Sequence, residues 1–276
     1  MTTPITTYPA KKLLWVSDLH LDQARDHEKQ RLLQKLKDTR YDAVLLTGDI
    51  STAKGLVGHL AEISNACGLR PVFFTTGNHD YFGSSFAVVD QAVADLCSRQ
   101  RNLIALGQGE IIELSRNTAV IGHRGWYDGQ AGAGARTKVG SPDRYQISDF
   151  RSLSRSGYFE KLRSLGEESA AYFRSVLPRA LKRYRAVLVA THVPPCTQAL
   201  QHGGTYCHWE RQPYFANRAA GNAIVGISRH FTDRRIVIHA GHTHCRVVVH
   251  LMPNLEIRVA GAQPGFPAIQ EIVTID

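Results

Sequence analysis

The order of apolar segments along this chain predicts an α/β protein built on two β-sheets. Four short apolar runs rich in β-branched and aromatic residues each have the composition of a buried strand in a largely parallel sheet. Segments with apolar residues three and four positions apart, typical of helices, alternate with these runs. Further short runs follow one another without room for helices, and we expect them to form a second, partly antiparallel sheet packed face to face against the first.

The expected elements can be placed along the chain. Strands of the first sheet are expected at 13–17, 43–47, 72–75 and 186–190, and helices at 28–36, 56–66 and 86–96. Strands of the second sheet are expected at 102–106, 111–114, 118–122, 236–239, 246–251, 255–259 and 270–275.

Two long segments interrupt this alternation. Residues 125–148 are rich in Gly, Ala and charged residues and are expected to form a loop, whereas 158–184 has helical periodicity with an interruption at Pro178. Long excursions from a compact domain are usually functional or mobile. We expect a single domain over residues 1–276, with candidate caps or substrate loops at 123–184 and 193–222.

Composition excludes several classes of protein. Of 276 residues, 43% are hydrophobic, which is enough for a buried core, yet no run has the roughly 18 apolar residues of a membrane span. The polar start of the chain does not resemble a signal segment, so we expect a cytoplasmic protein. Its five cysteines are widely spaced and are expected to be reduced.

The formal net charge of +9 favours anionic ligands, because a positive surface raises their local concentration. The basic residues are scattered, however, and no nucleic-acid-binding module surrounds them. A nucleic-acid substrate therefore stays open without support from a motif, and nothing in the sequence indicates an oligomeric state.

Metal-ligand residues occur in a fixed order after the apolar runs. The motifs are Asp18-Leu19-His20, Gly48-Asp49, Gly77-Asn78-His79-Asp80, Thr191-His192 and Gly241-His242-Thr243-His244. One such motif arises easily by chance, but five in order indicate a site, because ligands bind outside the carboxyl ends of parallel strands. Gly48 allows the tight turn that would carry Asp49 to this edge.

The donor atoms in these motifs suit two divalent cations. Asp49 is the candidate bridging ligand, since its two carboxylate oxygens can bind two ions. Amide oxygen and imidazole nitrogen donors together favour Mn, Fe, Co, Ni or Zn over Mg or Ca, and of these we expect manganese. Two such ions could activate a water as hydroxide for in-line attack on phosphorus.

The ordered motifs resemble those of the calcineurin-like metallophosphoesterase family and extend from Asp18 to His244. The resemblance implies a two-sheet β-sandwich flanked by helices, in four layers α/β/β/α. It also implies that one metal ion is held by Asp18, His20, Asp49 and His244, and the other by Asp49, Asn78, His192 and His242.

The resemblance further places a histidine that binds no metal, His79, beside the leaving group. A positioned imidazolium could protonate the leaving oxygen as a general acid. Asp80 is expected to orient this ring, because imidazoles commonly need a partner that fixes their tautomer.

Three residues outside the motifs are candidates for substrate binding. His123 and Arg124 end the strand expected at 118–122, and His208 lies in the second excursion. For His123 and Arg124, a structural role in a turn stays open as the alternative.

The sequence thus predicts a binuclear metal-dependent phosphoester hydrolase acting on an anionic phosphoester. We favour a phosphodiesterase, because a monoester dianion would benefit from Arg or Lys donors and the motifs contain none. A phosphomonoesterase in which Arg124 supplies the cation, and a non-catalytic scaffold that kept the fold, are the alternatives.

Overall fold

The first apolar runs form a five-stranded sheet in the computed structural model, which describes residues 5–202 and 205–276. Its strand order is β14 (Ile269–Thr274), β2 (Lys12–Val16), β3 (Ala43–Thr47), β4 (Val72–Thr75) and β5 (Leu103–Ala105). β2 to β5 are parallel, and β14 pairs antiparallel with β2.

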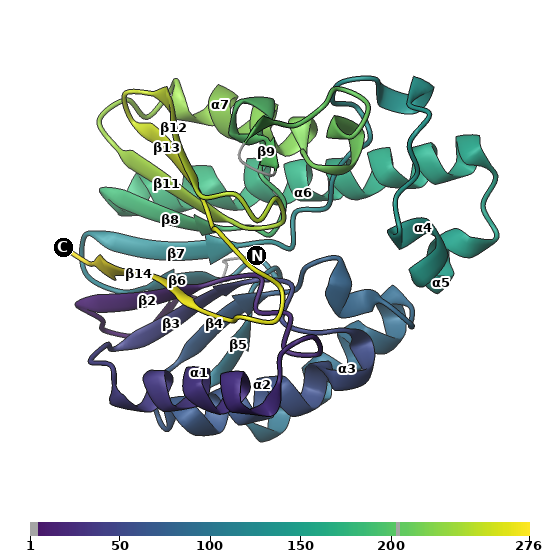
Figure 1. Ribbon diagram of the computed structural model, residues 1–276. Coiled ribbons are helices and arrows are strands. Elements are labelled where there is room, and N and C mark those ends of the chain that lie inside the picture. Colours follow the sequence, from purple (N-terminus) through teal and green to yellow (C-terminus); the bar gives the residue numbers. More distant parts are fainter. Residues whose placement is uncertain (1–4, 203–204) are drawn as a thin grey trace.

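Three helices cover the outer face of this sheet (Figure 1). They are α1 (Asp26–Asp38), α2 (Ala53–Cys67) and α3 (Phe86–Arg99). The buried residues Leu56, Leu60 and Ile63 of α2 recur at helical spacing and belong to the same core cluster as Val44 and Leu46 of β3.

The remaining long strands form a seven-stranded sheet. Its order is β1 (Ile5–Thr7), β6 (Ile111–Glu113), β7 (Thr118–Gly122), β8 (Ala186–Ala190), β11 (Arg235–Ala240), β13 (Leu255–Val259) and β12 (Val247–Met252). β7, β8, β11 and β13 are parallel, whereas β6 and β12 pair antiparallel with β7 and β13. Helices α6 (Arg155–Arg183) and α7 (Arg218–Ser228) cover its outer face (Figure 1).

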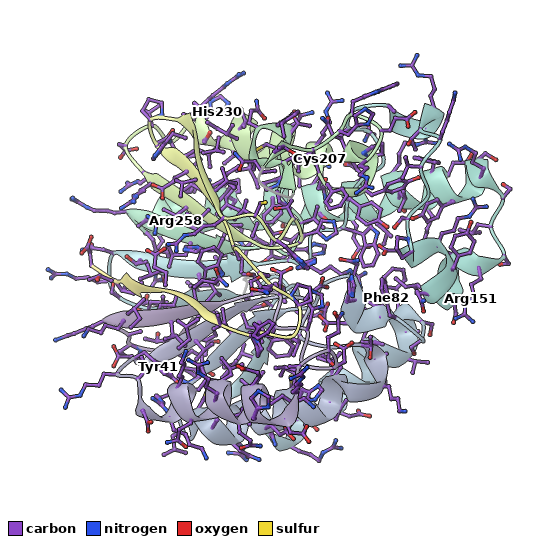
Figure 2. All side chains as sticks on the ribbon, viewed as in Figure 1. Tyr41, Phe82, Arg151, Cys207, His230 and Arg258 are labelled. Atoms are coloured by element: carbon purple, nitrogen blue, oxygen red, sulfur yellow. The ribbon has the colours of Figure 1, made fainter. Side chains whose placement is uncertain are left out.

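A third apolar cluster joins the two sheets. Alternate residues of each strand point to opposite faces, so Leu13, Trp15 and Leu45 face the seven-stranded sheet, where they meet Val120 and Leu188. Side chains fill the space between the two sheets (Figure 2). The predicted fold of two sheets flanked by helices is confirmed, with four layers.

The assignment of some strands to sheets was wrong. Residues 186–190, expected in the first sheet, form β8 in the seven-stranded sheet, between β7 and β11. Residues 102–106 and 270–275, expected in the second sheet, contain β5 and much of β14 in the five-stranded sheet. Periodicity reports burial, but the path of the chain between strands decides which sheet each strand joins.

The two excursions contain short elements. They are η2 (Gly134–Arg136), α4 (Asp143–Gln146) and α5 (Ser148–Arg151) in the first, and η3 (Thr197–Ala199), β9 (Gln201–His202), β10 (Thr205–Tyr206) and η4 (Gln212–Tyr214) in the second. Pro178 lies inside α6, which continues through it. Among the described residues, no helix combines the length and apolar character of a membrane span.

Candidate metal centre

The motif residues lie at one edge of the sandwich, where parallel strands of both sheets end. Asp18 and His20 follow β2, Asp49 follows β3, Asn78 and His79 follow β4, His192 follows β8, and His242 and His244 follow β11. Polar contacts cross from one sheet to the other at this edge. The Nδ1 atom of His192 lies 2.9 Å from the carbonyl oxygen of Thr47, and the backbone amide of His242 donates to Asp18 Oδ1 at 2.8 Å.

Asp18, His20, Asp49 and His244 form the first cluster. One nitrogen or oxygen atom of each lies within 4.8 Å of the corresponding atoms of the others. His244 Nε2 is 3.4 Å from Asp18 Oδ1, and His20 Nε2 is 3.7 Å from Asp49 Oδ2 and 3.0 Å from His244 Nε2. Two carboxylates and two imidazoles that converge in this way could hold a divalent cation.

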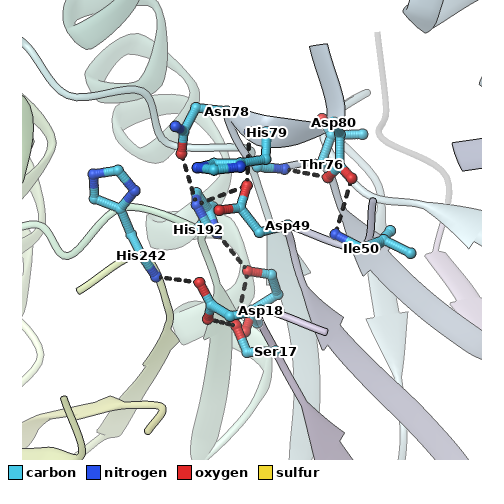
Figure 3. A network of polar contacts seen from close by, with 12 residues as sticks. Ser17, Asp18, Asp49, Ile50, Thr76, Asn78, His79, Asp80, His192 and His242 are labelled. Atoms are coloured by element: carbon cyan, nitrogen blue, oxygen red, sulfur yellow. Dashed lines mark hydrogen bonds and ion pairs between the residues drawn. The ribbon is translucent and has the colours of Figure 1, made fainter. Parts of the chain in front are cut away.

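Asp49, His192 and His242 form the second cluster and share Asp49 with the first. His192 Nε2 lies 3.3 Å from Asp49 Oδ1 and 3.1 Å from Asn78 Oδ1 (Figure 3). Asp49 and His192 are each 1% exposed. The two oxygens of Asp49 therefore face two different sets of nitrogen donors, as a bridging carboxylate requires.

Hydrogen bonds outside the second cluster determine which atoms face it. The backbone carbonyls of Thr47 and Tyr214 can only accept, so they take protons from His192 Nδ1 at 2.9 Å and from His242 Nε2 at 2.7 Å. Asn78 Nδ2 donates to Asp143 Oδ1 at 3.2 Å. The remaining atoms, His192 Nε2, His242 Nδ1 and Asn78 Oδ1, are left with lone pairs that could bind a cation.

The backbone at these turns adopts a conformation that side chains disfavour. The non-glycine residues with positive φ in the described part of the chain are Asp18 (50°), His20 (41°), Asp49 (51°), His242 (72°) and His244 (58°). Each such residue costs on the order of 1–3 kcal/mol, and backbone strain of this kind concentrates at functional sites. All five belong to the predicted ligand set.

Glycines make these turns fit together. A Cβ atom at Gly77 would collide with the carboxylate of Asp49, and one at Gly241 would collide with that of Asp18. Because only glycine leaves this space, the backbone of one motif can approach the carboxylate of another.

The buried carboxylates create a field that attracts positive charge. Burial alone would raise the pKa of Asp49, but His192 and the other histidines hold it well below its ordinary value. Burial likewise would lower the pKa of His192, whereas the charge of Asp49 raises it to about 10. The same field would favour a metal cation at His192 Nε2, for which proton and metal compete.

Both clusters open into a cavity of about 390 Å³, which we call the metal cavity. Its floor includes Asp49, Asn78 and His242, and its upper walls come from both excursions. The wall residues are Tyr127, Val139, Gly140, Ser141, Pro142 and Asp143 from the first excursion and Arg211, Tyr214 and Phe215 from the second.

Residues 11–246 match the family model described as calcineurin-like phosphoesterase, which covers most of the chain. The chain belongs to this family. It is a metal-dependent phosphoesterase, and the predicted family and enzyme class are confirmed.

Solved structures share the fold of this phosphoesterase. Phosphopantetheinyl hydrolase from Mycobacterium tuberculosis has a TM-score of 0.63 and 13% identity, covering 92% of this chain and 90% of that chain. A dimetal phosphatase from Danio rerio has a TM-score of 0.55 and 15% identity, covering 92% and 88%. At these identities the similarity shows the fold alone. No curated protein was found to match the sequence.

Asp80 does not orient His79 in the phosphoesterase, and this part of the prediction was wrong. The Asp80 carboxylate is fully buried and accepts a hydrogen bond from the backbone amide of Ile50 at 2.9 Å (Figure 3). It also accepts from the backbone amides of Ser51 at 2.9 Å and Gly77 at 2.7 Å. It therefore joins the turn after β3 to the turn after β4. Asp80 is a structural support for Asp49 and Asn78.

His79 lines the metal cavity beside the first cluster. Its backbone amide donates to Asp49 Oδ1 at 2.9 Å, and its ring stacks on Phe82 with centroids 4.2 Å apart. The ring also contacts that of His20 edge to face, at 4.7 Å. Packing against Phe82, rather than a carboxylate, holds this imidazole.

The candidates His123 and Arg124 are not among the residues that line the metal cavity. They line a different cavity, where Arg124 donates to Tyr81 Oη at 3.1 Å, Asp90 Oδ2 at 3.2 Å and Glu168 Oε1 at 3.3 Å. His123 Nε2 lies 3.6 Å from the same Glu168 oxygen. The backbone carbonyl of Arg124 accepts from the amide of His192 at 3.0 Å, but the side chains of both residues point toward Glu168 of α6.

His208 is exposed and does not line the metal cavity either. Its Nδ1 accepts a hydrogen bond from the backbone amide of Glu210 at 3.4 Å. The basic residue that the second excursion contributes to the cavity is Arg211.

Asp143 is a site residue that sequence reasoning missed. It is 2% exposed, accepts from Asn78, and also accepts from the hydroxyl of Tyr127, which contacts the hydroxyl of Tyr158 at 3.1 Å. Burial raises the pKa of Asp143. Asp143 is the first residue of the short helix α4 in the first excursion, which is too short to show a periodic pattern that would predict the inward direction of its side chain.

Proposed function

We propose that this phosphoesterase hydrolyses a phosphodiester and uses two divalent cations. Asp18, His20, Asp49 and His244 would hold one cation, and Asp49, Asn78, His192 and His242 the other. The observation that carries the proposal is the pair of clusters that share Asp49, each containing nitrogen and oxygen donors. This donor set suits Mn first, with Fe, Co, Ni and Zn as alternatives.

The cations, when bound, would supply Lewis-acid charge for the phosphoryl oxygens and an acidified water as nucleophile. The chain supplies position and protons. His242 Nε2–H is engaged by Tyr214 and His192 Nδ1–H by Thr47, so neither ring can rotate without breaking a buried hydrogen bond. Ligands that are already held in place need not reorganise during the reaction, which lowers the free energy of the transition state.

His79 would protonate the leaving oxygen. Its ring faces the metal cavity, and the bond from its backbone amide to Asp49 fixes its place relative to both clusters. A general acid in such a position contributes about 10² to 10⁴-fold to the rate, most for leaving groups that are strong bases.

The lining of the cavity favours a diester over a monoester. Asp49 and Asn78 are buried at its floor. Among the described residues that line the cavity, Arg211 is the one Arg or Lys, and its side chain is exposed. A monoester dianion gains most from cationic donors around the phosphate itself. Apolar wall residues such as Val139 and Phe215 would suit a second organic substituent, which a diester has and a monoester lacks.

A phosphomonoesterase is the second candidate, and Arg211 is the observation that favours it. The side chain of arginine is long and flexible, so Arg211 could reach inward and supply the cation that the sequence motifs lack.

A comparison of bis-p-nitrophenyl phosphate with p-nitrophenyl phosphate, in the presence of Mn, separates the two. We expect kcat/KM to be at least about 10-fold higher for the diester, and a faster monoester reaction would reverse the assignment. In labelled water, one solvent oxygen should enter the phosphorus-containing product in a single turnover. Trapping of a covalent phosphoenzyme would contradict direct attack by water.

A further inference from the structure

Arg211 presents a cation without an anionic partner at the mouth of the metal cavity. Its side chain is exposed and lines the cavity. Its backbone amide donates to the carbonyl oxygen of His208, and its backbone carbonyl accepts from the amide of Tyr214. Among the described residues, no carboxylate forms an ion pair with its guanidinium. Arg124, by contrast, is bound by Asp90 and Glu168.

The polypeptide that carries Arg211 is fixed relative to the metal clusters. Arg211 immediately precedes η4, and the carbonyl of Tyr214 at the end of η4 accepts from His242 Nε2 at 2.7 Å. The hydroxyl of Tyr214 donates to Val139 O at 2.9 Å, which ties the second excursion to the first. The backbone of Arg211 is therefore held in place by hydrogen bonds of its own and of neighbouring residues, although the side chain is exposed.

The cavity changes character from floor to mouth. Asp49 and Asn78 at the floor are 1% and 4% exposed, and Tyr214 in the wall is 6% exposed. Apolar side chains of Val139, Pro142 and Phe215 lie along the same wall lining, and Arg211 is exposed at the opening. The lining of this cavity therefore combines buried cation-binding groups, apolar side chains and the exposed positive charge of Arg211.

We infer that Arg211 binds a second anionic group of the substrate, away from the phosphorus that is attacked. The substrate class is then a phosphodiester whose organic substituent has an apolar portion and ends in a carboxylate or a further phosphate. This inference rests on the proposed diesterase function and adds the identity of the substituent. A guanidinium suits either anion, since its paired N–H donors match two oxygens at once.

The test uses two p-nitrophenyl phosphodiesters whose second substituent is a six-carbon chain, ending either in a methyl group or in a carboxylate. Wild-type enzyme with Mn should prefer the carboxylate ester by about 10-fold in kcat/KM, through KM, because one charge-assisted hydrogen-bonded pair is gained. In Arg211→Ala this ratio should fall to about one, and in Arg211→Glu below one.

Arg116→Ala is the matched control. Arg116 is exposed in the turn between β6 and β7, at the opposite end of β7 from its carboxyl end. The control removes the same charge from the molecule and should keep the wild-type ratio. A ratio retained in Arg211→Ala, or the absence of any preference in the wild type, would overturn the inference.

A binding measurement separates this inference from the diesterase proposal. Hexyl phosphate and its carboxylate-ended analogue are titrated calorimetrically into Mn-loaded wild type and Arg211→Ala. If the wild type binds the analogue more tightly than hexyl phosphate and Arg211→Ala does not, the role of Arg211 in binding the second anion is supported. If, in addition, neither diester is hydrolysed, the diesterase proposal fails while the role of Arg211 stands. Equal affinities in both proteins would refute the role of Arg211.

Discussion

Two cavities lie at the same edge of the sandwich and differ in how their charges are used. The metal cavity, of about 390 Å³, exposes two sets of donor atoms to its interior. The second, which we call the Arg124 cavity, is larger at about 690 Å³, but its cation is bound by Asp90, Glu168 and Tyr81. Cavity size and position at strand ends therefore do not identify the site. What distinguishes the metal site is two sets of nitrogen and oxygen donors that converge and share Asp49.

The two cavities have a wall in common. Tyr81 belongs to η1 (His79–Tyr81), so the segment that carries His79 on one side contacts the Arg124 cluster on the other. The Tyr81 hydroxyl contacts Thr76 at 2.8 Å and donates to Asp90 at 2.7 Å. The hydrogen bonds of Tyr81 with residues of the Arg124 cavity thus help to hold the backbone of η1, which carries His79.

The largest effect is expected from Asp49, which both clusters share. Asp49→Ala should lower kcat/KM by at least about 10³-fold, because it removes the shared carboxylate and with it the preorganised charge of both sites. Turnover of a chromogenic diester with Mn measures this. Asp26→Ala, at a side chain 98% exposed on α1, is the control and should match the wild type. Comparable rates for both variants would remove the basis of the site.

His79→Ala should have the next largest effect, and the size should depend on the leaving group. We expect a loss of about 10² to 10⁴-fold for alkyl leaving groups, which need a proton, and a much smaller loss for p-nitrophenolate. The exposed His230, changed to Ala, is the control. A loss independent of the leaving group would argue against proton donation.

Asp143→Ala should weaken metal binding by about 10- to 100-fold, since it removes the group that turns the oxygen of Asn78 inward. Calorimetric titration with Mn measures the affinity directly. Asp143→Asn, which keeps an acceptor oxygen, should lose less. Tyr145→Ala, at a 69% exposed residue of the same helix α4, should bind Mn as the wild type does. Unchanged affinity in Asp143→Ala would contradict the positioning role.

Arg124→Ala should reduce stability rather than activity. It leaves Asp90 and Glu168 without their cation, and hydrogen bonds to charged groups contribute on the order of 1–3 kcal/mol. Denaturant unfolding should show this loss, while kcat/KM changes by less than about 3-fold. A large loss of activity with unchanged stability would restore Arg124 to the active site.

The smallest effect is a pH dependence in the Arg124 cavity. The hydrogen bond from His123, with the charge of Arg124, lowers the pKa of Glu168 below its ordinary value of 4.5. Its contribution to stability is therefore present above about pH 4.5 and is lost as the pH falls through the lowered pKa. Melting temperatures of wild type and Glu168→Gln should converge below pH 4.5. If the difference in melting temperature between wild type and Glu168→Gln did not change with pH, the charge of Glu168 would not contribute to stability.

The sequence predicts the floor of the metal cavity better than its walls. Asp18, Asp49 and His192 directly follow apolar strands, so their place at the carboxyl edge follows from strand periodicity and the parallel order. Asp143 and Arg211 lie at the starts of the short elements α4 and η4 within the excursions, where the direction of a side chain depends on tertiary contacts that no local pattern encodes.

Proximity in sequence also misled in identifiable ways. Asp80 follows His79, but in the tight turn of η1 its carboxylate points back to backbone amides after β3. Arg124 follows a strand end as the ligands do, yet β7 delivers it next to α6 and its Glu168. The hydrogen-bond partners of each side chain, namely backbone amides for Asp80 and carboxylates for Arg124, determined its role, and its position in the sequence did not.

The metal content of the purified protein tests the central claim most directly. After loading with Mn, the wild type should bind two ions per chain, and its electron paramagnetic resonance spectrum should show a magnetically coupled pair, because Asp49 faces both clusters. One ion per chain, or two ions without coupling, would contradict a shared centre.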